Sequence, residues 1–178
     1  MNNLLRLLYI FILNFNSIKM RAIDKLLNEY GESHQNATNK FIHWICVPVI
    51  FWTIVALLWS VKLGVEIPST TYHLNLALFA LVAVIFYYIK LSIRLAIGML
   101  LFAFACIAIT DRLEENLTSL HFPLWGLALI LFVIAWIFQF VGHNIEGKKP
   151  SFLKDLQFLL IGPAWLMHFI YKKIGVKY

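Results

Sequence analysis

The chain has 178 residues, of which 61% are hydrophobic and 13% are charged, and its formal net charge is +6. A soluble domain is about 45–50% apolar and about 25% charged, and a chain this short cannot bury such a surplus in a core of its own. The composition therefore excludes an ordinary soluble protein, and the lack of an aromatic–basic RNA motif or a basic DNA-reading helix argues against nucleic acid as a partner.

The first apolar stretch lies before residue 20. It is too short to cross a bilayer, and no small-residue cleavage site follows it as in a signal peptide. We therefore expect residues 1–19 to be an N-terminal extension or an interfacial helix. Residues 20–178 then form one membrane-embedded domain.

Four further segments are apolar over about the 20 residues that a membrane helix needs, or nearly so. They are residues 41–61, 74–89, 91–110 and 122–141, and the turn between the second and third is tight. A fifth stretch, residues 156–174, contains Gly162-Pro163 and predicts a broken interfacial or re-entrant helix. The predicted fold class is all-α, a polytopic membrane helical bundle of about four transmembrane helices.

Basic residues fall in alternate connections, which predicts the orientation. The connections following the first and third segments hold only Lys62 and Arg112, whereas the other three regions are rich in lysine and arginine. Because such residues gather on the cytoplasmic side, we expect both termini to be cytoplasmic. The basic residues of those three regions are Lys19, Arg21, Lys25, Lys40, Lys90, Arg94, Lys148, Lys149, Lys154, Lys172, Lys173 and Lys177.

This topology sorts the six histidines into two groups. His73 and His121 fall on the outer side, and the other four fall at the inner side. Neutral imidazole is a common protein ligand for iron and zinc, so four histidines at one membrane face predict a possible metal site. The inner histidines are His34, His43, His143 and His168.

His34 and His43 are nine residues apart, about half a turn out of phase on one helix. They can share a ligand only if the helix breaks between them, and Asn36 or Asn39 can cap a new helix there. Asn39 and His43, four apart, share a face. The alternative interpretation is a helix cap followed by an interfacial histidine.

Gln139, His143 and Glu146 lie on one helical face, at steps of four and three. Polar groups on one face at the inner end of a span indicate a site, a polar helix contact or a helix end that reaches into the headgroups. His168, near Trp165, is also typical of a membrane interface. Arg94 fits a phosphate contact at the interface or a contact to a substrate carboxylate.

Three separate motifs resemble those of the Mpo-type family of membrane proteins, and the resemblance extends over residues 20–178. The motifs are Glu29-Tyr30-Gly31-Glu32-Ser33-His34-Gln35-Asn36 with Asn39 and His43-Trp44-Ile45-Cys46-Val47-Pro48, then Gln139-Phe140-Val141-Gly142-His143-Asn144-Ile145-Glu146-Gly147-Lys148-Lys149-Pro150, and Gly162-Pro163-Ala164-Trp165.

The resemblance implies an iron(II)-dependent dioxygenase that uses O2 to shorten 2-hydroxy fatty acids by one carbon, as in the fungal member of the endoplasmic reticulum. It implies Fe(2+) held by the four inner histidines, Glu146 as the catalytic carboxylate, and Asn39 and Gln139 beside the ligands. Arg94, Lys148 and Lys149 are candidates to hold the substrate carboxylate. The location is the inner membrane in a bacterium and the endoplasmic reticulum in a eukaryote.

Two rival functions fit the same residues. The first is a non-catalytic membrane carrier or assembly protein whose histidines serve packing or proton handling. The second is a hydrolase that holds zinc, which has no redox role. Metal content and dependence on O2 distinguish the three.

Overall fold

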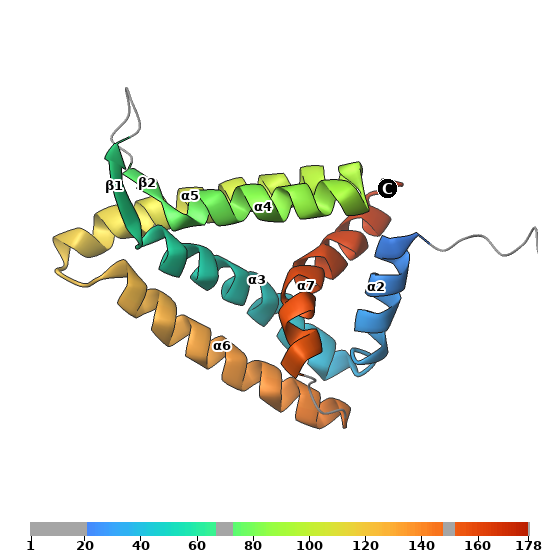
Figure 1. Ribbon diagram of the computed structural model, residues 1–178. Coiled ribbons are helices and arrows are strands. Elements are labelled where there is room, and N and C mark those ends of the chain that lie inside the picture. Colours follow the sequence, from blue (N-terminus) through green and yellow to red (C-terminus); the bar gives the residue numbers. More distant parts are fainter. Residues whose placement is uncertain (1–20, 67–72, 148–151, 178) are drawn as a thin grey trace, which may run out of the picture.

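Six helices and one small hairpin make up the part of the chain that the computed structural model describes, which is residues 21–66, 73–147 and 152–177 (Figure 1). The expected all-α class is confirmed, although the hairpin was not predicted. Residues 1–19 and the candidate residues Lys148 and Lys149 lie outside the described residues. The elements are α2 (Ala22–Glu32), α3 (Ala37–Trp59), β1 (Lys62–Glu66), β2 (His73–Asn75), α4 (Leu76–Leu91), α5 (Ile93–Ser119), α6 (Leu124–Glu146) and α7 (Phe152–Lys173).

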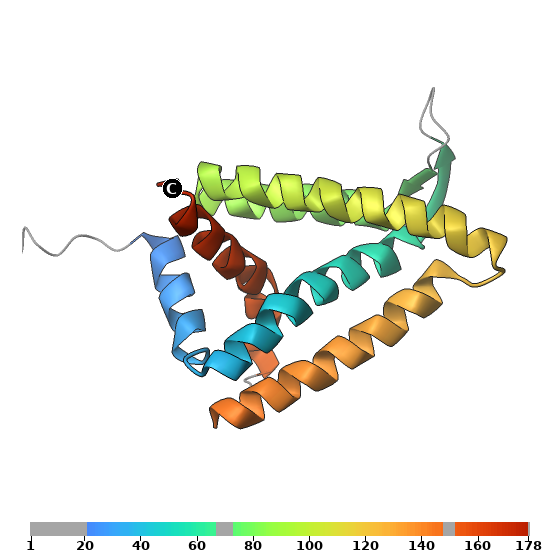
Figure 2. The same ribbon diagram turned by 180° about the vertical axis from the view of Figure 1, so that it is seen from behind.

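The two ends of the molecule are built differently. At one end, α2 and α7 gather around the start of α3 and the end of α6 (Figures 1 and 2). At the other end lie the antiparallel β1–β2 hairpin and the connection from α5 to α6. The helices α4 and α5 run side by side as a hairpin whose turn is the single residue Ser92, as the sequence predicted.

Three helices, α3, α5 and α6, are long and apolar enough to cross a membrane. The fourth expected span, α4, is apolar but has only 16 residues, about 24 Å of helix against the roughly 30 Å of a hydrocarbon core. Large apolar side chains are exposed over α4, α5 and α6, including Phe86, Phe104 and Ile137. Lipid is the surrounding that such an apolar surface fits.

The end of α5 extends nine residues beyond the predicted boundary at Thr110. Its polar last turns are anchored, because the Glu114 carboxylate accepts a hydrogen bond of 2.7 Å from Trp59 Nε1 and pairs with Lys62 at 3.0 Å. The charged segment after Thr110 is therefore helical, although the apolar pattern of the sequence predicted a loop there.

Small residues spaced seven apart bring α6 against α3. Ala128, Ala135 and Gly142 are all buried, and they face successive turns of α3 from the middle of the helix towards its start. Lipid tails are as apolar as the helices, so helix pairs in a membrane depend on close packing through small side chains. This row, which we call the α6 seam, sets the spacing of the two helices.

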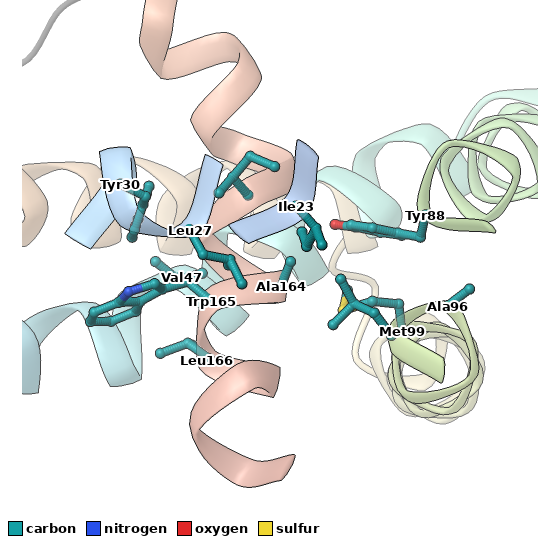
Figure 3. Close-up of a cluster of buried hydrophobic side chains, with 12 residues drawn as sticks. Ile23, Leu27, Tyr30, Val47, Tyr88, Ala96, Met99, Ala164, Trp165 and Leu166 are labelled. Carbon is teal, nitrogen blue, oxygen red and sulfur yellow. The ribbon is translucent and has the colours of Figure 1, made fainter. Parts of the chain in front are cut away.

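The helix α7 continues through Gly162-Pro163 without interruption, so the predicted break there is wrong. Buried Tyr88, on α4, donates its hydroxyl to Leu160 O in the turn of α7 that precedes Pro163. Gly162 lets α7 approach closely, since a Cβ there would lie 3.1 Å from the Tyr30 hydroxyl. Figure 3 shows Tyr30 of α2 on one side of α7 and Tyr88 of α4 and Met99 of α5 on the other, with Ile23 of α2 next to Tyr88.

Candidate metal centre

A break between α2 and α3 brings His34 and His43 together. The helix α2 ends at Glu32, and Asn36 caps α3 by accepting hydrogen bonds from the backbone N–H groups of Thr38 and Asn39. The structure therefore has the helix break that His34 and His43 need in order to face the same point. The two imidazole rings meet edge to face, with centroids 4.2 Å apart.

His143 joins this pair from the last turns of α6. Its ring centroid lies 4.9 Å from that of His43 and 5.3 Å from that of His34. Each of the three residues offers a nitrogen, and these atoms all lie within 4.8 Å of one another. Since His34 and His43 are only 2% and 1% exposed, the group lies inside the protein rather than on its surface. We call it the histidine triad.

The backbone fixes which nitrogen of two triad members points inward. His34 Nδ1 lies 2.6 Å from Tyr30 O, and His43 Nδ1 lies 2.9 Å from Asn39 O. A carbonyl only accepts, so each Nδ1 must carry the proton and each Nε2 keeps its lone pair. Both Nε2 atoms are buried without a hydrogen-bond partner among the described residues. Burial lowers the pKa of His34 to about 4, which keeps its ring neutral at pH 7.

An unpartnered buried acceptor costs about 1–3 kcal/mol, and here two such acceptors belong to the same cluster. Histidines that bind metals commonly donate the other ring N–H to a carbonyl or carboxylate, which fixes the tautomer and orients the ring. His34 and His43 have this arrangement, with Tyr30 O and Asn39 O as the carbonyl acceptors. The triad is therefore suited to bind a divalent metal ion.

Glu146, at the end of α6, holds the loop that carries His34. Its carboxylate accepts hydrogen bonds from the backbone N–H groups of Gln35 at 2.8 Å and Asn36 at 2.9 Å, and from Asn39 Nδ2 at 3.0 Å. These donors precede and begin α3, so the negative charge also meets the positive end of that helix. Glu146 therefore holds the loop that carries His34, and Asn39 lies beside the triad, where its carbonyl contacts His43 Nδ1.

Asn39 and Gly142 are in close contact where α3 meets α6. Asn39 is fully buried, and its amide donates to Ser33 O as well as to Glu146. A Cβ at Gly142 would lie only 2.4 Å from Asn39 Oδ1. Gly142 was not among the predicted site residues, although a glycine next to a helical histidine was the available signal. Tyr30 was also missed, and its ring stacks on His34 with centroids 4.1 Å apart.

Three predicted residues lie elsewhere. His168 is on α7 and is not a member of the triad, but it shares the wall of a pocket with His34. Arg94 begins α5, where its guanidinium donates to Lys177 O near the C-terminus. Gln139 is buried one turn before His143. The structure therefore brings together three of the four inner histidines with Asn39 and Glu146.

A pocket of about 320 Å³ opens beside the triad between α2 and α7. Of the three triad histidines, only His34 is in its wall. Lys40 from the first turn of α3 and His168 supply polar groups, while Leu27, Trp165 and Phe169 supply apolar ones. Volumes above about 300 Å³ with a few polar groups in an apolar wall are typical of small-molecule sites.

Comparison with known proteins was made for sequence and for structure. Residues 20–174 match the family model described as 2-hydroxy-palmitic acid dioxygenase Mpo1-like. The chain is 30% identical over 151 residues to the 2-hydroxy-palmitic acid dioxygenase MPO1 of Saccharomyces cerevisiae, which covers 84% of this chain and 79% of the yeast protein. No solved structure matches. Together with a motif set that folds into one buried triad, the match places this chain in the Mpo1-like family.

Proposed function

We propose that the protein is an iron(II)-dependent dioxygenase that converts 2-hydroxy fatty acids into fatty acids one carbon shorter. The observation that carries the proposal is the triad, in which two buried imidazoles present Nε2 lone pairs to one point. The yeast relative is a 2-hydroxy-palmitic acid dioxygenase, which supports the substrate class.

The donor set fits the metal. Three imidazoles suit iron, zinc, copper and nickel, and the dioxygenase relative favours a redox-active member of this group. Three protein ligands also leave coordination positions open. Iron(II) would supply redox chemistry with O2 and bind the 2-hydroxyl and carboxylate of the acid at these positions.

The proposed reaction balances without another reductant. The bond between C1 and C2 breaks. One atom of O2 enters C2, which becomes the new carboxyl carbon, and the other enters C1, which leaves as CO2 with one water. The two carbons lose four electrons, which is the number needed to reduce O2 fully.

The protein's own groups hold the reacting centre in place. Tyr30 O and Asn39 O fix the tautomers of His34 and His43, and Glu146 fixes the loop between them. The triad lies at the end of the spans that the charge pattern assigns to the cytoplasmic side. We propose that the acid approaches there with its tail in the membrane.

Metal analysis and O2 uptake on 2-hydroxypalmitate test this function. Replacing His34, His43 or His143 by Ala should each abolish turnover and lower bound iron. Pairs of these changes should do no further harm, because groups that act as one unit fail together. His73→Ala and His121→Ala are the matched controls, since both residues lie at the other end of the spans, about 30 Å away.

Each alternative outcome has a separate meaning. Bound zinc with no O2 uptake would favour a hydrolase, and purified protein without bound metal would favour a carrier. Loss of iron in His73→Ala or His121→Ala, with iron retained in His143→Ala, would place the metal at the opposite end of the spans and refute the triad as its site.

A further inference from the structure

The pocket beside His34 contains a cation whose charge is not neutralised by an ion pair. Lys40 is half-buried in its wall, and it forms no ion pair among the described residues, whereas Arg21, Lys62 and Arg112 each have one. It also lies in the first turn of α3, where the helix dipole opposes a positive charge. A half-buried cation held against a dipole is poised to bind an anion.

Lys40 and the triad share one small space. His34 is in the wall of the same pocket, and the two residues are near enough for the charge of Lys40 to act on the imidazole. An anionic group in contact with Lys40 is therefore held next to the triad. His168, on the α7 side, adds a second nitrogen donor or acceptor to the polar part of the wall.

The acidic residues in the pocket wall do not cancel this preference. Asp24 is held by Arg21 through two hydrogen bonds of 2.7 and 2.8 Å. Glu32 is exposed, so that water and salt screen its charge. Among the described residues that line the pocket, Lys40 is the only lysine or arginine.

The aromatic residues of the pocket wall connect to an exposed residue outside it, Trp44. Trp165 and Phe169 meet edge to face with centroids 4.6 Å apart, and Phe169 lies 6.3 Å from Trp44. Trp44 is 41% exposed, next to Ile45 at 53%. Figure 3 shows Trp165 lying beside Leu27 at the α2 side of α7. A chain of methylene groups can follow this wall from the pocket to the bilayer.

We infer that this pocket binds the head of the long-chain 2-hydroxy acid, with Lys40 pairing with its carboxylate and the Trp165–Phe169 wall carrying the first part of its tail. The inference rests on the proposed function and assigns its substrate anchor to a residue on α3, in place of Arg94. Lys40 acts here as a binding and specificity residue, because a neutral head group gains nothing from it.

Binding under nitrogen tests the anchor without turnover. Iron-loaded protein in lipid nanodiscs is titrated with radiolabelled 2-hydroxypalmitate and with hexadecane-1,2-diol, which keeps the chain and the 2-hydroxyl but has no charge. Lys40→Met should weaken binding of the acid roughly tenfold, the value of one half-buried charged contact, and leave diol binding within about twofold. Lys40→Arg keeps the charge and should stay near wild type. Lys25→Met, on the exposed face of α2, is the control.

The outcomes separate this inference from the proposed function. If wild-type protein takes up O2 with 2-hydroxypalmitate but binds acid and diol equally, the charged anchor is wrong and the function stands. If Lys40→Met binds the acid as wild type does, the anchor is also wrong. Should Lys40→Met lose both ligands through misfolding, Lys40→Arg decides, and weak acid binding in that variant overturns the assignment. Wild-type protein that neither binds nor oxidises the acid refutes the proposed function itself.

Discussion

The contact between Gly142 and Asn39 makes the packing of α6 on α3 testable through Gly142→Ala. The added methyl carbon would lie 2.4 Å from Asn39 Oδ1, where ordinary contact begins at 3.4 Å, so about 1 Å of movement is needed. The Asn39 amide cannot simply turn away, because it donates to Ser33 O and Glu146 Oε2. Either these hydrogen bonds break or α6 moves outward and takes His143 with it.

Both ways of relieving the clash disturb the triad. Overpacking of this kind costs about 1–3 kcal/mol, which corresponds to about 5- to 150-fold in an equilibrium constant. A functional constellation tolerates displacements of only about 0.5 Å. We therefore expect Gly142→Ala to weaken iron binding at least about tenfold and to lower the midpoint of thermal unfolding.

Chelator competition and thermal unfolding in detergent measure both effects. Gly126→Ala is the matched control, since it places the same methyl group on the same helix at an ordinary distance of 3.4 Å from Pro123 Cγ. Iron affinity and unfolding midpoint equal to wild type in Gly142→Ala would refute the claim that α6 is held against α3 at this point.

Three further changes test other parts of the arrangement. Glu146→Gln removes the charge that holds the His34 loop and should weaken iron binding about 10- to 100-fold. Glu115→Gln, at an exposed position, is the control and should leave iron affinity unchanged, and equal affinities in the two variants would contradict the positioning role of Glu146. Reporter fusions after Leu120 and after Tyr178 should read non-cytoplasmic and cytoplasmic respectively, and a cytoplasmic signal at the first would overturn the proposed orientation. Tyr88→Phe removes the hydrogen bond from this buried hydroxyl to Leu160 O and should lower the free energy of unfolding by about 1 kcal/mol in chemical denaturation, whereas no loss would mean that this contact between α4 and α7 does not stabilise the fold.

Features of the site that depend on a few neighbouring residues could be predicted from the sequence. The spacing of His34 and His43 required a helix break if the two were to share a ligand, and the structure has that break with Asn36, one of the two predicted caps, at the start of α3. The shared face of His143 and Glu146 followed from helical geometry. These are local rules, with a reach of about one or two turns. They identified three residues of one buried cluster and the carboxylate that positions it.

Features that depend on the path of a distant helix could not be predicted in this way. Whether His168 reaches the triad is decided by where α7 crosses α3, and the part of α7 around Pro163 packs against residues far away in the chain, such as Tyr30 and Tyr88. Arg94 was considered for the substrate because a cation near a membrane helix has many possible partners. Its contact with Lys177 O depends on the C-terminal residues returning to α5.

The α6 seam connects the packing of the spans to the chemistry of the site. Ala128, Ala135 and Gly142 hold α6 against α3 along its length, and the last of them is the residue directly before His143. Because the spacing of seven keeps one face of α6 on α3, the register that buries Ala128 and Ala135 also points His143 at His43. The packing of Ala128 and Ala135, which lie away from the triad, therefore contributes to the position of His143. Gly142→Ala adds a methyl group at the last contact of the α6 seam, next to His143. The loss of iron affinity in this variant therefore measures how much the geometry of the triad depends on the packing of α6 against α3.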